Sequence, residues 1–340
     1  MDIRHKALRI GEPYLTAVQV GDMMNISTTM AQRAMNILAE KDILVRRRNA
    51  GTFVGMGLEG VDGVLVRTVH VLLPEDRDST LVRTEPLLEG IRSVIHGAGV
   101  NFNFIPSGEE IRYVRELLDT KDAPRKTLGV VAIRGTREVY HYLARSGIPT
   151  VVFGTLWPGE PPLASINTDE HETGRLLTHY LIERSHRRMA LLTGATGWPG
   201  DNEFFDGVSE ALTKANLPHN AMITRMVPHD PAVFSAATRH LLELADRPTG
   251  IIVRGRKFAD LVSDTAKQLG ISSPDNLEIV FQDHATQEVE ESPYPHVQPQ
   301  ISFADIAVQI GRMLNAISLH QSLEAQKVVV PVRLCSPARK

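Results

Sequence analysis

Side chains that can bind phosphate groups and base edges lie together near the N-terminus. Three consecutive arginines, Arg46, Arg47 and Arg48, stand directly before the sequence Asn-Ala-Gly. The segment before them is rich in hydroxyl and amide side chains. Arginines bind phosphates, and hydroxyl and amide groups exchange hydrogen bonds with the edges of bases. This combination indicates an interface for nucleic acid.

Two short helices are expected to position these side chains. Thr16 can cap a helix that ends near Met24, and Asn25 suits the left-handed residue that ends it. Ser27 can cap a second helix over residues 28–41. The side chains expected to face inward are Val18, Val20 and Met23 in the first helix and Ala31, Ala34, Ile37 and Leu38 in the second. The other face of the second helix presents Thr28, Thr29, Gln32, Arg33 and Asn36.

A hairpin follows the second helix. Residues 43–45 and 52–54 are expected to be its strands, joined through the arginines and a turn over residues 49–51. The polar helix face alone fits either DNA reading or simple solvation. Arginines clustered at a turn favour DNA, where Gln32 can pair with adenine and Arg33 with guanine or a phosphate.

The run STTMAQRAMNILAEKDILVRRRNAGTFV, over residues 27–54, resembles the winged helix-turn-helix of GntR-type regulators. The resemblance implies a DNA-binding domain over residues 1–57 that contacts double-stranded operator DNA. The residues expected to contact DNA are Thr16, Ser27, Thr28, Thr29, Gln32, Arg33, Arg46, Arg47, Arg48, Asn49, Gly51 and Thr52. The family usually has a basic residue at Thr28 and often has arginine at Gln32, so the resemblance implies no particular operator sequence.

Charge and composition agree with a DNA-binding N-terminus on a cytoplasmic protein. Residues 1–57 carry eight basic and five acidic side chains, whereas the whole chain has a net charge of -3. The single cysteine, Cys335, and a polar N-terminal segment without a signal-peptide core indicate a cytoplasmic location. No apolar run of about 18 residues occurs, so no membrane association is expected.

Beyond a glycine-rich stretch predicted as a linker over residues 58–67, strands and helices alternate. The expected strands are 69–73, 102–105, 128–133, 150–153, 189–192, 222–226, 250–253 and 277–281. The expected helices are 87–96, 110–118, 137–145, 204–215, 232–245 and 258–269. The strands are continuous apolar runs, which is typical of parallel sheets buried on both faces. The fold class is therefore α/β, with a small winged helix-turn-helix domain and a two-lobed, doubly wound domain over residues 68–340.

Three motifs of the larger domain resemble the effector domain of LacI-type regulators, which has the periplasmic-binding-protein fold. They are Gly147-Ile148-Pro149, SINTDEHETGRL over residues 165–176, and RSHRRMALLTG over residues 184–194. The resemblance implies that the chain crosses between lobes near Asp169. It also implies that a helix over residues 305–317 returns to the first lobe and that residues 327–334 form a closing strand. Because one short recognition helix offers little contact area, we expect a homodimer that reads two half-sites.

A small-molecule effector is expected between the lobes, at the carboxyl ends of the strands. Its expected contacts are Glu75, Arg134, Trp198, Phe204, Arg254, Arg256 and Asp283. Sugar-binding LacI-type members generally have arginine where this chain has Phe204, whereas Asp283 matches their acidic contact. Trp198 can stack on a ring or pack its own loop, and Arg254 and Arg256 can meet an anionic group or remain solvated. The effector is expected to be a sugar, sugar acid or sugar phosphate.

An enzyme is not expected, because His171, His186, His284 and Asp283 are scattered and no catalytic motif occurs. Neither a cofactor nor a metal is expected, since no metal-ligand spacing occurs. The sequence thus predicts a ligand-responsive, sequence-specific DNA-binding transcriptional regulator, most simply a repressor. The alternative is a solute-binding or sensor protein without DNA-binding activity, against which the arginine-rich hairpin argues.

Overall fold

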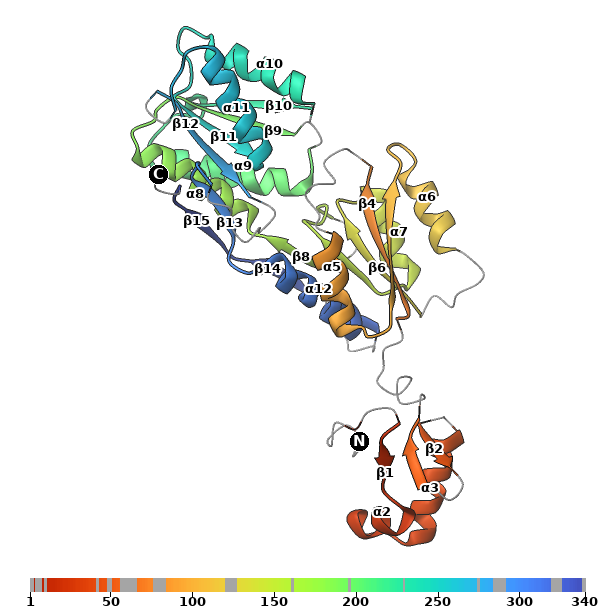
Figure 1. Ribbon diagram of the computed structural model, residues 1–340. Helices are drawn as coiled ribbons and strands as arrows, with labels where there is room; N and C mark the ends of the chain where they lie inside the picture. Colours follow the sequence, from red (N-terminus) through yellow and green to blue (C-terminus); the bar gives the residue numbers. More distant parts are fainter. Residues whose placement is uncertain are drawn as a thin grey trace.

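The computed structural model describes a small N-terminal unit, called the head below, and two larger α/β lobes (Figure 1). The described residues are Ile3, Leu8, 11–40, 43–47, 51–55, 66–75, 84–119, 127–159, 162–194, 197–228, 230–273, 276–283, 292–318 and 326–337. Within these ranges no helix is both long and apolar enough to cross a lipid bilayer.

Among its described residues, the head has helices α2 (Ala17–Met24) and α3 (Thr28–Glu40) and a three-stranded antiparallel sheet. The sheet has the order β1 (Pro13–Tyr14), β3 (Gly51–Val54) and β2 (Leu44–Arg47). The hairpin predicted from the sequence is therefore present. Strand β1, which is too short for its sequence to reveal it, pairs with β3 and widens the sheet.

The predicted caps hold helices α2 and α3. Gln19 N donates to Thr16 Oγ1 at 3.4 Å, and Thr16 N donates to Gln19 Oε1 at 2.8 Å, which completes a capping box. Asn25 ends α2 with a φ of 54°. Met30 N donates to Ser27 Oγ at 3.2 Å. Thr16 and Ser27 therefore have local structural roles, whatever they contact outside the head.

The core of the head differs in part from the predicted one. Its buried side chains are Ile3, Val20, Ala31, Met35, Ile43, Leu44 and Val54, with Leu38 packed against them. The prediction was right for Val20, Ala31 and Leu38 and wrong for Val18, Met23, Ala34 and Ile37, which are exposed. For Ala34 and Ile37 the reason is the phase of α3: the buried stripe passes through Ala31, Met35 and Leu38, so Ile37 lies outside it and is 53% exposed.

The first lobe is a parallel sheet covered on both faces. Its strand order is β14 (Lys327–Val330), β8 (Ala164–Thr168), β7 (Thr150–Phe153), β6 (Leu128–Ile133), β4 (Thr68–Pro74) and β5 (Gly99–Ile105). Helices α5 (Thr84–Val94) and α12 (Phe303–Ser318) pack on one face. Helices α6 (Glu110–Leu118) and α7 (Arg137–Ser146) pack on the other. Strand β4 sends Val71 to the first face and Leu72 to the second, so both faces are apolar.

The second lobe repeats this design. Its strand order is β10 (Met222–Val227), β9 (Met189–Gly194), β11 (Gly250–Arg254), β12 (Glu278–Gln282), β13 (His296–Pro299) and β15 (Val332–Cys335). Only β15 runs antiparallel to its neighbour. Helices α8 (Glu170–Glu183) and α9 (Pro199–Lys214) cover one face, and α10 (Pro231–Leu242) and α11 (Arg256–Gln268) cover the other. A short 3-10 helix, η3 (His219–Ala221), precedes β10. The two doubly wound lobes predicted from the sequence are confirmed.

Three segments connect the lobes, side by side. The chain leaves the first lobe after β8, returns between β13 and α12, and crosses again between β14 and β15. Asp169 N donates to Val330 O at 3.0 Å, and Gln300 N donates to Pro331 O at 2.8 Å, so hydrogen bonds join the connections. The single closing strand predicted over residues 327–334 is therefore wrong. Pro331 has no N–H for a ladder, and it separates two strands that belong to different sheets.

The two lobes together, called the body below, include Val66, which the prediction placed in the linker. The expected linker ran to residue 67, but Val66 is 1% exposed and lies in the core of the first lobe. Arg67 N also donates to Thr127 O at 2.7 Å. Residues 56–65 lie outside the described residues. A linker must end before Val66, because a side chain buried in the core belongs to the lobe.

Two glycines permit a close crossing of α8 and α9. A Cβ atom at Gly174 would lie 2.2 Å from Phe204 O, and one at Gly207 would lie 1.9 Å from His171 O. The backbones of the two helices therefore touch, which no residue with a side chain allows. This crossing fixes α9, whose first turn carries polar residues of the candidate site.

A polar cluster joins helix α8 and the residues that follow it to the amino ends of β11 and β12. Tyr180 donates its hydroxyl to Glu278 Oε1 at 3.1 Å, and His186 Nε2 lies 3.7 Å from Glu278 Oε2. The guanidinium of Arg184 lies 3.8 Å from the centre of the Tyr180 ring. His186 also shares a hydrogen bond of 2.9 Å with Thr249 Oγ1. His186 is therefore a structural residue.

Glu278→Gln is expected to destabilise the protein by about 1.5–3 kcal/mol at pH 7, because it weakens hydrogen bonds to a charged group. Burial opposes ionisation of Glu278, but its contacts with His186, Tyr180 and Arg184 hold its pKa below the ordinary 4.5. A lowered pKa stabilises the fold above about pH 4.5 and less as the pH falls. Urea unfolding at pH 7 and pH 4 tests this. An equal difference between wild type and variant at both pH values contradicts the role of charge.

Candidate functional site

The exposed face of α3 and the β2–β3 hairpin form a polar, cationic surface on the head. Thr28, Thr29, Arg33 and Asn36 are exposed on α3, and Gln32 is half-buried. Arg46 and Arg47 are exposed on β2, and the Arg47 guanidinium lies 4.8 Å from the centre of the Phe53 ring. Gly51 has a φ of 107°, and Thr52 follows it in β3. Arg48 and Asn49 lie outside the described residues. The surface can bind phosphates and offer hydrogen bonds to bases.

A cavity of about 210 Å³ lies at the carboxyl ends of β4, β5 and β6. Its lining residues are Pro74, Ile105, Ser107, Glu110, Arg134, Gly135, Thr136, Val139 and, from the second lobe, Trp198. Arg134 has a φ of 53°, which is uncommon for a residue other than glycine. Such conformations cost of the order of 1–3 kcal/mol and gather at binding sites. Arg134 and Trp198 were both predicted to contact the effector, and both line this cavity.

Trp198 reaches the cavity from the N-terminus of α9. Its ring centre lies 6.3 Å from that of Trp157, which follows β7 in the first lobe. The Trp157 indole donates to Gly135 O at 3.0 Å. The Trp198 Nε1 atom is buried and has no hydrogen-bond acceptor among the described residues. An unpaired buried donor costs about 1–3 kcal/mol, so a ligand that offers an acceptor to Trp198 gains that energy.

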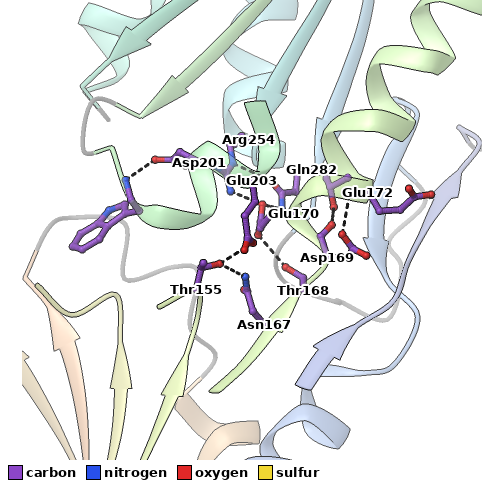
Figure 2. Close-up of polar contacts among 12 residues, drawn as sticks. Thr155, Asn167, Thr168, Asp169, Glu170, Glu172, Asp201, Glu203, Arg254 and Gln282 are labelled. Atoms are coloured by element: carbon purple, nitrogen blue, oxygen red, sulfur yellow. Dashed lines mark hydrogen bonds and ion pairs between the residues drawn. The ribbon is translucent and has the colours of Figure 1, made fainter. Parts of the chain in front are cut away.

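Arg254, at the carboxyl end of β11, lies between two carboxylates of the second lobe (Figure 2). Its Nη2 is 2.8 Å from Glu170 Oε2, its Nη1 contacts Asp201 Oδ1, and its Nε donates to Gln282 Oε1 at 2.9 Å. Gln282 and Thr168 also donate to Glu170, at 2.9 and 3.0 Å. The three charged side chains are nearly buried and carry a net charge of −1. The positive charge of Arg254 is therefore neutralised within the lobe.

This network also positions Trp198. Asp201 Oδ2 accepts a hydrogen bond of 2.8 Å from Trp198 N, while its other oxygen contacts Arg254. The first turn of α9 is thus tied to the ends of β11 and β12. Arg254 acts on the cavity through Asp201 rather than by reaching the cavity itself.

Glu203 joins the lobes directly, as Figure 2 shows. Thr155, which follows β7 in the first lobe, donates to Glu203 Oε2 on α9 at 3.1 Å. Asn167 in turn donates to Thr155 Oγ1 at 2.5 Å, and Lys327 Nζ lies 3.7 Å from Glu203 Oε1. These four residues were not among the predicted effector contacts. No local pattern marks the contacts of Glu203, because they form only where the lobes meet.

The remaining predicted effector contacts lie away from the cavity lining. Phe204 is 1% exposed, lies in a core cluster and has the Arg254 guanidinium 5.1 Å from its ring centre. Glu75 is exposed at the end of β4. Arg256 is half-exposed, with Nε 3.6 Å from Asp260 Oδ2. Asp283 follows β12, where its N donates to Val297 O at 2.8 Å. Within the described residues, no group of side chains could hold a metal ion.

Comparison with known proteins identifies the fold of the body. A family model described as a periplasmic binding protein-like domain matches residues 178–336. A LacI family transcriptional regulator from Enterococcus faecium, solved with bound ribose, matches the structure with a TM-score of 0.63 and 18% identity. The match covers 80% of this chain and 100% of that one. The fold of the body is that of a periplasmic-binding-protein-like domain. The LacI-type resemblance of the body is thereby confirmed at the level of the fold.

Two further relatives extend this comparison. The transcriptional repressor PurR of Vibrio atlanticus strain LGP32 is 25% identical over 228 residues, which make up 64% of this chain and 65% of the repressor. The chain therefore matches a little under two thirds of that repressor's length. A complex of the transcriptional regulator CelR with cellobiose matches with a TM-score of 0.67 and 19% identity, over 95% of this chain and 99% of that one. These relatives are regulators rather than enzymes, in agreement with the prediction. The GntR-type character of the head stays a prediction.

Proposed function

We propose that this chain is a cytoplasmic, ligand-responsive transcriptional regulator that binds operator DNA as a homodimer and acts as a repressor. In this proposal residues 1–57 form a winged helix-turn-helix of the GntR type, the following residues up to 65 link it to the body, and the body binds the effector. The observation that carries the proposal is the joining of a cationic helix-and-hairpin surface to a periplasmic-binding-protein-like body. Regulators with such bodies are the relatives described above.

The charges around the cleft favour a small neutral effector, such as a sugar, over a sugar phosphate. Arg254 is neutralised by Glu170 and Asp201, and the lining of the cavity includes the carboxylate of Glu110 as well as Arg134. A doubly charged phosphate at Arg254 would have to displace the two carboxylates that already hold it. A neutral ring can instead stack on Trp198 and accept a hydrogen bond from its buried Nε1. Glu75, Arg256 and Asp283 are then candidates for contacts made when the lobes close. The regulator solved with cellobiose shows that a related body holds a saccharide.

Arg47→Ala is expected to weaken binding to every DNA sequence alike. Each phosphate that the protein no longer neutralises makes the negative slope of log Kobs against log salt concentration shallower by about 0.9. The measurement is a salt titration of duplex binding by the full chain. Arg225→Ala is the matched control, because Arg225 is an exposed arginine on β10, outside the head. A slope that stays unchanged in Arg47→Ala contradicts binding of phosphate by the hairpin.

The effector and its control of DNA binding are tested together. Thermal denaturation in the presence of neutral sugars, sugar acids and sugar phosphates identifies the ligand, because binding to the folded state raises stability by RT ln(1 + [L]/Kd). That ligand should then change operator affinity by about 5- to 150-fold. A chain that binds sugars but no DNA duplex at any salt would be the alternative, a sensor without DNA-binding activity.

A further inference from the structure

Gln32 on α3 and Arg46 on β2 are joined by their side chains. The Gln32 amide faces the Arg46 guanidinium, which has only donors. The amide therefore turns its oxygen toward β2, where it accepts from Arg46 Nη2 at 2.5 Å and from Nη1 at 2.8 Å. In the opposite orientation, the amide nitrogen would donate to Asn36 Oδ1 at 3.3 Å, but it would face the N–H groups of the arginine at the shorter distances of 2.5 and 2.8 Å. The contact links the helix of the head directly to its hairpin.

This contact changes what Gln32 can offer to a base. A carbonyl oxygen has two lone pairs, and a guanidinium that donates through both terminal nitrogens occupies both. Only the amide N–H₂ of Gln32 then remains for a partner outside the head. Arg46 adds further donors and no acceptor. The pair as a whole presents donors to the surrounding solution.

Adenine and guanine differ in this respect. In the major groove adenine shows an acceptor, N7, and a donor, N6–H₂, and a free glutamine pairs with both. Guanine shows two acceptors, N7 and O6. A glutamine whose oxygen is already occupied cannot accept from adenine N6. It can still donate to guanine.

We propose that the Gln32–Arg46 pair determines base specificity, making α3 read guanine in place of the adenine that a free glutamine would select. This inference rests on the proposed DNA-binding function. Arg46 acts as a positioning residue for Gln32, in addition to any phosphate that it contacts. The predicted pairing of Gln32 with adenine is thereby replaced by a different one, for a reason that only the folded head reveals.

The experiment is selection of preferred duplexes from a pool with randomised sequence, using the full chain and its variants. The wild type is expected to select guanine at one position of each half-site, and Gln32→Ala should lose the preference at that position only. Arg46→Ala frees the amide oxygen, so the preference there should move from guanine to adenine. A good bidentate pair discriminates by about 5- to 150-fold, which sets the size of the adenine preference expected in Arg46→Ala.

Two further variants keep the test decisive. Arg47→Ala is the matched control, because Arg47 packs on Phe53: it should bind less tightly with the same base preference. Arg46→Lys keeps the positive charge if Arg46→Ala binds too weakly for selection. A lysine donates from a single nitrogen, so adenine should then be accepted beside guanine.

The outcomes separate this inference from the proposal on which it rests. If the wild type selects no sequence and binds no duplex, the proposed function fails. If the wild type selects a sequence but Arg46→Ala and Arg46→Lys both keep guanine at the position that Gln32→Ala relaxes, Gln32 reads DNA without Arg46 and the inference is overturned. A selected sequence that Gln32→Ala leaves unchanged overturns it as well.

Discussion

Arg254→Ala is expected to destabilise the body by about 3–5 kcal/mol, the cost of breaking a buried ion pair by removing one partner. The variant leaves Glu170 and Asp201 close together and nearly buried, without a positive charge between them. It also removes the donor that Gln282 Oε1 accepts from, so the end of β12 is held less firmly. Chemical unfolding, followed by tryptophan fluorescence, measures the destabilisation.

A variant without charge at these positions distinguishes the effect of charge from that of packing. The triple variant Arg254→Met, Glu170→Gln and Asp201→Asn, which carries no charge at these positions, should recover much of the stability. If the triple variant is as unstable as Arg254→Ala alone, the uncompensated charge is not the cause.

Arg254 also illustrates which part of the site the sequence could not predict. Its position at the end of a strand was evident, but its partners Glu170 and Asp201 stand 84 and 53 residues away in the chain. No local pattern distinguishes an arginine that meets a ligand from one that two distant carboxylates neutralise. The same holds for Thr155 and Glu203, which belong to different lobes.

The elements themselves were easier to predict, where each carried its own local signal. Strand β6 and helix α6 have the predicted bounds, because an unbroken apolar run and a helical repeat define them. Strand β8 and helix α8 were not predicted, since the segment SINTDEHETGRL is mostly polar although much of it is buried. Strand β13, with the sequence HVQP, was not predicted either, because it is short and half polar. Buried polar residues mark the connections between the lobes, and hydrophobic patterns miss them.

Gly207→Ala is expected to cost about 1–3 kcal/mol or more, as overpacking in a well-packed core does. The new methyl group would lie 1.9 Å from His171 O, a backbone atom of α8 that no change of rotamer can move away. Helix α9 must therefore shift away from α8. This shift also moves Trp198 and Glu203, which lie on the first turns of the same helix, so binding of the effector should weaken together with stability.

The Gly207 prediction has a graded control in the first lobe. Gly311 is also a buried helical glycine, but a Cβ there would meet the Val94 side chain at 3.2 Å and Ile91 Cα at 3.3 Å, which small adjustments relieve. Gly311→Ala should therefore be the milder change, and Asp206→Ala, at an exposed position on α9, should stay within about 0.5 kcal/mol. Thermal and urea unfolding of the three variants give the order. Equal destabilisation by Gly207→Ala and Gly311→Ala would show that α8 and α9 can separate at little cost, and that their crossing does not fix Trp198.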